Sequence, residues 1–371
     1  MAAFLFIKYQ LLAYSKYFRH HNFIRRVIEK INIDRFINLS NQLPVLDARS
    51  PGEYNHAHIP GAYSFPLFSD EERKIVGTAY KQKSREEAIK IGLDFFGVKM
   101  RKMVESAENI LSEHNKGENN RTVLIHCWRG GMRSTAIAWL LDLYGFKVHT
   151  LAGGYKSFRN WVLEQFNIKY NFKILGGYTG SGKTPLLQEL VNKNIAVIDL
   201  EKLANHKGSA FGAIGEQPQP GQEMFENKLA VELSNKSKNI SPIWMEDESQ
   251  RIGGMMIPKS IWEQMRISPV YFLEIPFEER LQYLVTTYGS YKNDELVNAI
   301  MRIQKRLGGL ETKNAINYIL ENNKLESFRI LLQYYDKLYT KGLNNRPQVT
   351  EQLIKINCNT VSPLNYEKLG Y

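Results

Sequence analysis

Short apolar runs alternate with longer amphipathic stretches along most of the chain. Runs such as 122–126 (TVLIH) and 147–151 (KVHTL) have the length and β-branched content of buried strands. Residues 134–144 between them are typical of a helix, and Gly145 is placed to end it. This alternation predicts an α/β fold with a doubly wound parallel sheet. The other predicted strands are 43–47, 172–176, 195–199, 240–245, 270–274 and 355–360, and the other predicted helices are 85–96, 102–114 and 185–192.

The pattern divides into two α/β units, as a length of 371 residues suggests at about 150 residues per domain. We expect the first unit over 31–166 and the second over 171–371, with a mostly helical tail after Phe277. Residues 1–30 differ from both units, because they carry six Lys and Arg residues, many aromatic residues and one acid. For this segment we expect a helical extension or an over-long start assignment rather than an organelle-targeting peptide.

Charge and cysteine content narrow the class of protein. Lys and Arg number 49 against 38 Asp and Glu, and this net charge of +11 favours a polyanionic partner such as a nucleic acid. No run of about 18 apolar residues occurs, so we expect no membrane-spanning helix. The two cysteines, Cys127 and Cys358, are too few for a disulfide framework or a four-thiolate zinc site. We therefore expect a reducing, cytoplasmic setting and no structural metal.

A cysteine stands directly after the predicted strand 122–126 and opens the loop 126–134, which leads into a helix. Backbone N–H groups of such a loop, together with the helix N-terminus, stabilise an anionic sulfur. Arg129 and Arg133 add positive charge, so we predict a lowered pKa and a nucleophilic Cys127. The spacing His-Cys-x5-Arg-Ser also matches cysteine-dependent phosphatases, and the loop alone leaves that chemistry open.

The second unit opens with a phosphate-binding motif. Residues 177–184 (GYTGSGKT) fit G-x-x-x-x-G-K-[ST] between a predicted strand and a predicted helix. We expect the backbone N–H groups to surround a diphosphate, Lys183 to neutralise it and Thr184 to bind Mg²⁺. The motif predicts a phosphorylated ligand but does not identify it. The residues expected to contact phosphate are Gly177, Gly180, Ser181, Gly182, Lys183 and Thr184.

Acidic residues end two later strands of the second unit. Asp199 follows one strand, and Glu246, Asp247 and Glu248 follow another. Because carboxyl ends of parallel strands share one sheet edge, these acids could hold the water shell of a magnesium ion. Arg251, on the next predicted loop, adds a basic group. We therefore predict a polar pocket beside the phosphate loop.

Three stretches around the cysteine loop resemble a rhodanese domain over about residues 32–164. They are 47–54 (DARSPGEY), 58–62 (HIPGA) and 151–156 (LAGGYK), in this order around Cys127. Domains of that family carry sulfur or selenium on their cysteine as a persulfide or perselenide. The resemblance favours this chemistry over a phosphatase, although both occur on one fold.

A rhodanese domain followed by a phosphate loop in one chain is typical of fewer protein families than either part alone. With the strings 76–83 (VGTAYKQK), 199–212 (DLEKLANHKGSAFG) and 246–253 (EDESQRIG), the chain from about Ile31 onward resembles tRNA 2-selenouridine synthases. The resemblance implies that wobble 2-thiouridine in tRNA becomes 2-selenouridine with selenium from selenophosphate. It also implies an S-geranyl intermediate made from geranyl diphosphate.

The loops can be given roles that fit this reaction. We expect Cys127 to carry selenium, Arg129 and Arg133 to bind the selenophosphate oxyanion, and the phosphate loop to bind the diphosphate. The expected partner is the anticodon region of tRNA, bound by a monomer. Arg302, Lys305 and Arg306 are candidate tRNA contacts, although a solvated helix face explains them equally well.

Other functions stay open at this point. One is a sulfurtransferase fused to an ATP-using kinase or adenylating domain, and another is a non-catalytic, nucleotide-gated RNA-binding module.

Overall fold

The computed structural model describes residues 28–115, 120–238, 241–347 and 352–370. The chain forms two compact units, one comprising 1–55 and 61–158, the other 56–60 and 159–371. The division falls inside helix α8 (Gly154–Gln165), ahead of the boundary expected between residues 166 and 171. Most of the predicted extension 1–30 lies outside the described residues. Its last two residues differ from the prediction, because Glu29 and Lys30 pair with a strand of the first sheet.

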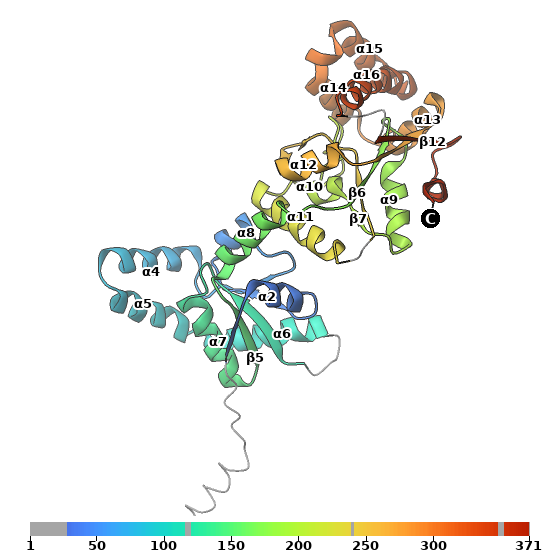
Figure 1. Ribbon diagram of the computed structural model, residues 1–371. Helices are drawn as coiled ribbons and strands as arrows, with labels where there is room; N and C mark the ends of the chain where they lie inside the picture. Colours follow the sequence, from blue (N-terminus) through green and yellow to red (C-terminus); the bar gives the residue numbers. More distant parts are fainter. Residues whose placement is uncertain (1–27, 116–119, 239–240, 348–351, 371) are drawn as a thin grey trace, which may run out of the picture. The chain divides into compact units, whose positions relative to one another are not determined.

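The first unit is built on a sheet of five parallel strands in the order β1-β5-β4-β2-β3. Helices lie beside this sheet in Figure 1. Its central strand β4 (Thr122–His126) is apolar along most of its length, because helices cover both faces of a parallel sheet. Leu46 of β2 pairs with Ile125 of β4, which sets the register next to the cysteine. The other strands are β1 (Glu29–Ile31), β2 (Val45–Asp47), β3 (Tyr63–Ser64) and β5 (Lys147–Leu151).

The helices of the first unit include one that the hydrophobic pattern did not predict. Helix α4 (Asp70–Gln82) begins at Ser69, whose hydroxyl accepts a hydrogen bond from Glu72 N while the Glu72 side chain accepts one from Ser69 N. This capping box starts a helix whose polar composition masks its periodicity. The remaining helices are α2 (Ile33–Ser40), α3 (Pro51–His56), α5 (Arg85–Gly97), α6 (Met100–Asn115) and α7 (Met132–Tyr144).

The second unit holds another sheet of five parallel strands, in the order β12-β11-β6-β8-β7. Its first strand in sequence, β6 (Phe172–Gly177), lies in the centre, and the chain crosses to each side of it in turn. This is the doubly wound arrangement, and the predicted α/β fold class is confirmed in both units. The other strands are β7 (Val197–Ile198), β8 (Ile243–Glu246), β11 (Val270–Glu274) and β12 (Leu353–Asn357), with an antiparallel pair β9 (Arg251–Ile252) and β10 (Met255–Met256).

The helical tail packs as a body with its own core. Leu281, Leu296, Ile319 and Leu332 come from four successive helices and are completely buried together. Within the described ranges, no helix is long and apolar enough to cross a membrane. The helices of the second unit are α9 (Lys183–Asn192), α10 (Leu200–Ala204), α11 (Gln222–Lys236), α12 (Lys259–Arg266), α13 (Phe277–Tyr288), α14 (Asn293–Leu307), α15 (Gly309–Leu320), α16 (Lys324–Asn344) and the 3₁₀ segment η1 (Pro363–Leu369).

The helix that follows the cysteine loop offers a test of the first core. Leu141 on α7 is completely buried, whereas Leu143 on the same helix is 63% exposed. We expect Leu141→Ala to lower the free energy of unfolding by about 3 kcal/mol, because it leaves a cavity, and Leu143→Ala to change it by less than about 0.5 kcal/mol. Urea denaturation of both variants checks this. Equal changes in the free energy of unfolding would contradict the conclusion that Leu141 faces the core and Leu143 faces solvent.

Candidate active site

The thiol of Cys127 faces its own loop. The side chain follows β4 directly and is only 3% exposed. Its sulfur accepts hydrogen bonds from the Gly131 N–H at 3.3 Å and from the Ser134 hydroxyl at 3.2 Å. Both donors lie where α7 begins, so the start of this helix is directed at the sulfur.

The hydrogen bonds favour the thiolate. Burial alone raises the pKa of the Cys127 thiol, because an ion is poorly solvated in the interior. The hydroxyl and backbone of Ser134, the Gly131 N–H and the charge of Arg133 outweigh burial, and the net pKa lies below the ordinary value. The direction is the one expected from the sequence, although the largest favourable contribution comes from Ser134 rather than from an arginine.

The two loop arginines occupy different environments. Arg133 is half-buried and binds the Glu53 carboxylate at 2.6 Å, and Arg73 contacts the same carboxylate at 3.0 Å. Burial of Glu53 opposes its ionisation, but the hydrogen bond and charge of Arg133 lower the pKa of Glu53 to about 2. Arg129 is exposed to solvent. The guanidinium of Arg133 is therefore already paired, and the sequence could not reveal this because Glu53 lies 80 residues away.

The residues directly after β5 pack against the cysteine loop. An added Cβ at Gly154 would lie 2.3 Å from the Cys127 carbonyl oxygen, so this position requires glycine. The next residue, Tyr155, donates its N–H to that carbonyl at 2.8 Å. The buried Tyr155 ring in turn stacks on the guanidinium of Arg49, 3.8 Å from the ring centroid, and Arg49 forms a buried ion pair with Asp47 at 2.6 Å. These contacts explain why the loop is flanked by the stretches 47–54 and 151–156.

The phosphate loop turns sharply between β6 and α9. An added Cβ at Gly177 would lie 2.5 Å from the Ser181 hydroxyl oxygen, and Gly182, the residue before α9, has a φ of +71°. Glycine is therefore required at both ends of the turn. Lys183 bends back over the loop and donates to the Gly177 carbonyl at 3.0 Å. Its ammonium group thus lies over the loop that the motif assigns to a diphosphate.

Two glutamates lie near Lys183: Glu248, which belongs to the acidic run expected at the end of its strand, and Glu201, which was not expected from the sequence. The Thr184 hydroxyl donates to Glu201 at 3.4 Å, and Glu248 shares a hydrogen bond with Glu201. Burial raises the pKa of both carboxyl groups, and the charge of Glu201 raises that of Glu248 further, while Lys183 opposes these shifts. Both positions follow a strand of the same sheet. Glu201 lies in the first turn of α10, after β7, and Glu248 follows β8 by two residues.

The four residues predicted for the polar pocket have separate roles. Asp199 caps α10 by accepting the Lys202 N–H at 2.8 Å. Glu246 is completely buried and accepts the N–H groups of Leu200 and Glu201 at 3.2 and 3.3 Å. Burial, followed by the nearby Asp199 charge, raises the pKa of Glu246 well above its ordinary value.

The other two predicted pocket residues are engaged elsewhere. Asp247 accepts the Tyr339 hydroxyl at 2.6 Å and pairs with Arg346. Successive side chains of an extended segment point in opposite directions, so Asp247 diverges from Glu246 and Glu248. Arg251 is exposed and donates to the Gly253 carbonyl at 2.9 Å.

The helical tail holds the phosphate loop in place. Arg280 on α13 donates to the Thr179 carbonyl at 3.0 Å and forms a two-pronged ion pair with Asp336 on α16 at 2.9 and 2.7 Å. Tyr339, one turn further along α16, accepts the Gly177 N–H at 3.2 Å. The two contacts with the loop itself join residues 101 and 162 positions apart and were not predicted.

The oxygen donors near Lys183 suit a magnesium ion bound to a phosphorylated ligand. Within the described ranges, no group of three or more His, Cys, Asp or Glu side chains is placed to hold a metal ion. Magnesium needs fewer protein ligands, because it is commonly held by one or two carboxylates together with substrate phosphates and water. The hydroxyl of Thr184 beside the carboxylate of Glu201 fits that requirement.

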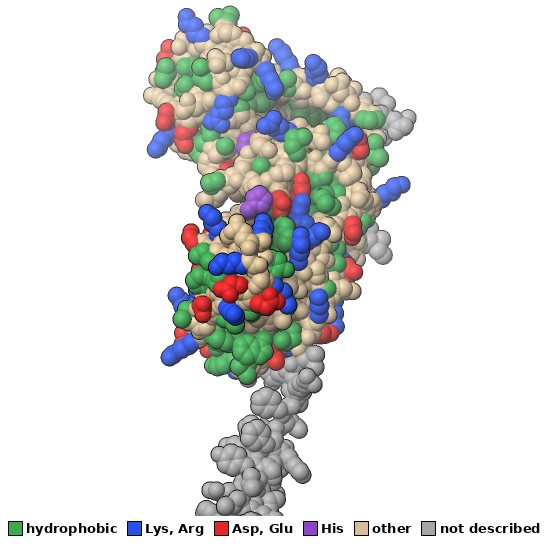
Figure 2. Space-filling model, turned by 90° about the vertical axis from the view of Figure 1, so that its left-hand side faces the viewer, with side chains coloured by type: hydrophobic (Ala, Val, Ile, Leu, Met, Phe, Trp, Pro, Cys, Tyr) green, Lys and Arg blue, Asp and Glu red, His purple; other side chains and the backbone are tan. Residues whose placement is uncertain are grey.

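The candidate tRNA contacts lie on one helix. Arg302, Lys305 and Arg306 are all exposed on α14. Figure 2 shows that Lys and Arg side chains on the visible face are dispersed, with Asp and Glu among them. The excess positive charge is therefore not gathered into one patch on this face.

Fold and loops together define a class of protein in which a rhodanese-like domain with an activated thiol is joined to a phosphate-loop domain. The model of the rhodanese-like domain matches residues 32–160, and that of the tRNA 2-selenouridine synthase AAA domain matches residues 170–357. The chain belongs to the tRNA 2-selenouridine synthase family, a family of tRNA-modifying enzymes.

Relatives of that name match both domains. The chain is 34% identical to the tRNA 2-selenouridine synthase of Sulfurovum sp. (strain NBC37-1), over 81% of this chain and 88% of the relative. It is 34% identical to that of Marinobacter nauticus, over 84% and 92%, and 33% identical to that of Bdellovibrio bacteriovorus, over 86% and 94%.

Removing one hydroxyl tests the environment of the thiol. We expect Ser134→Ala to slow iodoacetamide alkylation of Cys127 at pH 7 by about ten-fold, because a hydrogen bond to the thiolate is lost. Thr135→Ala is the matched control, since its hydroxyl bonds to the Gly131 carbonyl and makes no described contact with sulfur. Mass spectrometry of the Cys127 peptide across pH measures both rates. An unchanged rate in Ser134→Ala would refute the assigned role.

Proposed function

We propose that this protein converts 2-thiouridine at the tRNA wobble position to 2-selenouridine, using selenophosphate, by way of an S-geranyl intermediate made from geranyl diphosphate. The observation that carries the proposal is the presence of a thiolate-stabilising loop and a phosphate loop in one chain of this family. A reaction on tRNA is also consistent with the net charge of +11 and with a cytoplasmic setting.

The phosphate loop would serve the first step, in which alkylation converts the sulfur at C2 of the base from a poor leaving group into a good one. The thiocarbonyl sulfur attacks C1 of geranyl diphosphate, a C–S bond forms and the C–O bond to diphosphate breaks. The electron pair leaves with diphosphate, and the N3 proton of the base is released to solvent. Lys183 and the loop N–H groups would stabilise the charge that grows on diphosphate. A magnesium ion held by Thr184 and Glu201 would neutralise further charge on the phosphate oxygens.

The thiol loop would serve the second step. The Cys127 thiolate attacks the phosphorus of selenophosphate, an S–P bond forms, the P–Se bond breaks and hydrogenselenide leaves with the electron pair. Hydrogenselenide adds to C2 of the alkylated base, its proton moves to N3, the C–S bond breaks, and geranylthiol leaves with a proton from solvent. Water then hydrolyses the S–P bond, which releases phosphate and restores Cys127. The free N–H groups of the loop and the exposed Arg129 would bind the selenophosphate oxyanion, and Arg133 would first have to exchange its Glu53 partner.

The helical tail would contribute to tRNA binding. Arg302, Lys305 and Arg306 on α14 can approach phosphates of the anticodon arm, since all three are exposed. Contacts of this kind position an RNA without reading its sequence, and they weaken as salt rises.

A substitution in the phosphate loop tests the first step. We expect Lys183→Ala to slow formation of S-geranyl-2-thiouridine by about a hundred-fold, because the positive charge facing diphosphate is lost. Lys193→Ala, at the exposed end of α9, should leave the rate unchanged. Mass spectrometry of tRNA nucleosides after incubation with geranyl diphosphate measures both. Normal geranylation by Lys183→Ala would remove the phosphate loop from this step.

A substitution of the thiol tests the second step. We expect Cys127→Ser to reduce 2-selenouridine to background while S-geranyl-2-thiouridine accumulates, since the hydroxyl is a far weaker nucleophile. The geranylated product in the same sample is the control for folding and tRNA binding. If Cys127→Ser formed 2-selenouridine at the normal rate, release of selenium from selenophosphate would not depend on this residue.

A further inference from the structure

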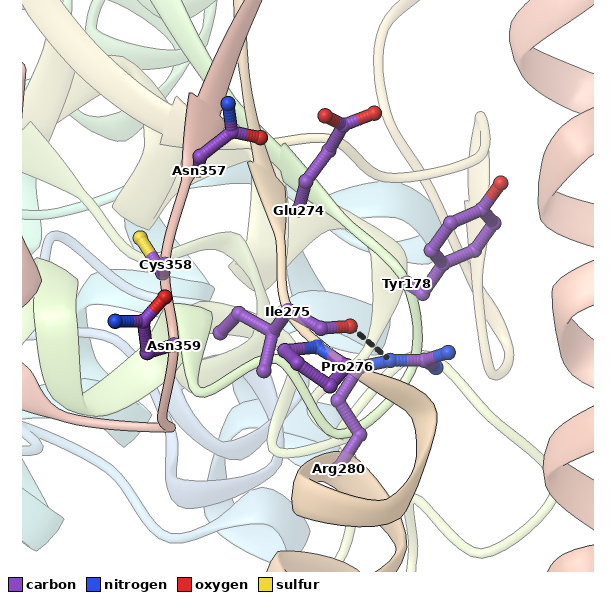
Figure 3. A pocket seen from close by; sticks show the side chains of 8 residues that line it. All are labelled: Tyr178, Glu274, Ile275, Pro276, Arg280, Asn357, Cys358 and Asn359. Atoms are coloured by element: carbon purple, nitrogen blue, oxygen red, sulfur yellow. Dashed lines mark hydrogen bonds between the residues drawn. The ribbon is translucent and has the colours of Figure 1, made fainter.

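A pocket of about 440 Å³ lies beside the phosphate loop in the second unit (Figure 3). Tyr178 of the loop lines it, together with Ile275 after β11 and with Asn357 and Asn359 at the end of β12. It therefore opens at the carboxyl edge of the sheet, where doubly wound folds bind their ligands. Its volume is in the range of small-molecule sites.

The charged groups that line this pocket already have partners. The Arg280 guanidinium binds Asp336 and the carbonyl oxygens of Thr179 and Ile275. The Glu274 carboxylate pairs with the Lys355 ammonium group at 2.7 Å. A phosphate would find its N–H donors and lysine in the neighbouring loop instead. The pocket is thus suited to the uncharged part of a ligand.

The neutral lining combines flat, apolar and amide surfaces. The ring of Tyr178 and the side chain of Ile275 offer apolar contact, and the exposed amides of Asn357 and Asn359 can both donate and accept hydrogen bonds. A prenyl chain would cover these amides without replacing their bonds to water, which is costly. A heteroaromatic base satisfies both requirements, since its faces are apolar and its edge is polar.

We propose that this pocket receives a heteroaromatic base and, resting on the function proposed above, that this base is the wobble 2-thiouracil of tRNA. Tyr178 belongs to both the pocket and the phosphate loop, and Arg280 joins the pocket to the Thr179 carbonyl of that loop. A base in the pocket therefore lies next to a diphosphate in the loop, as attack of its sulfur on the diphosphate ester requires. An unstacked tRNA base is the form that can enter such a pocket.

The base of a nucleotide has the same chemistry, so the experiment must separate the two sources. The variant is Asn357→Leu with Asn359→Leu, which keeps side-chain size and removes both amides. The probes are an anticodon stem–loop with 2-thiouridine at the wobble position, the same RNA with an abasic wobble position, ADP, and inorganic diphosphate. Asn317→Leu, an exposed asparagine on α15, is the control.

We expect wild type to bind the thiouridine stem–loop about ten-fold more tightly than the abasic one, and the double variant to bind the two equally. Binding of the abasic RNA and of diphosphate should stay unchanged, which also shows that the variant is folded. Asn317→Leu should retain the ten-fold preference.

Two results would overturn the assignment. If the double variant keeps the preference for thiouridine, the pocket does not hold the wobble base. If it instead loses affinity for ADP relative to diphosphate while keeping that preference, the base belongs to a nucleotide. Geranylation by wild type, measured alongside, separates failure of this inference from failure of the proposed function.

Discussion

Both functional loops depend on one constraint: a chain that turns sharply at the end of a buried parallel strand must find partners for its backbone N–H groups. After β4 the partner of the Gly131 N–H is a sulfur atom, and this hydrogen bond both completes the turn and favours the thiolate. After β6 the Gly177 N–H is bound by the Tyr339 hydroxyl, and the rest of the loop is shaped to surround an anion. The same turn thus shapes the backbone and directs N–H groups toward the centre of each loop.

Buried polar contacts behind each loop keep that geometry. In the first unit, the Asp47–Arg49 pair and the Tyr155 ring stacked on Arg49 support the cysteine loop. In the second, Arg280 and Tyr339 support the phosphate loop from helices that lie far along the chain. A buried charge is costly unless it is paired. Removal of one partner would therefore leave the other charge buried without a partner and disturb the loop. The helical tail therefore takes part in holding the phosphate loop as well as forming a core of its own.

Several charged groups near the two loops are paired. Arg133 is paired with Glu53, Arg280 with Asp336, and Lys183 lies near Glu201 and Glu248. Arg129 on the thiol loop and the exposed basic residues of α14 contrast with these pairs. The overall excess of positive charge thus says less about the binding sites than the positions of Arg129 on the thiol loop and of the basic residues on α14.

The sequence by itself determined the α/β class, the order of most strands along the chain, and the position of both loops, because local period, glycine spacing and motif length are properties of adjacent residues. It placed Cys127 directly after β4, and Lys183 at the end of the turn between β6 and α9. Only the tertiary structure decided which groups surround them. These neighbours are fixed only where helices and strands meet in space. They are Ser134 beside the Cys127 sulfur, Glu53 paired with Arg133, Glu201 and Glu248 near Lys183, and Tyr339 bonded to Gly177. Such contacts join residues up to 162 positions apart, and no local pattern encodes which distant side chain will fill a given space.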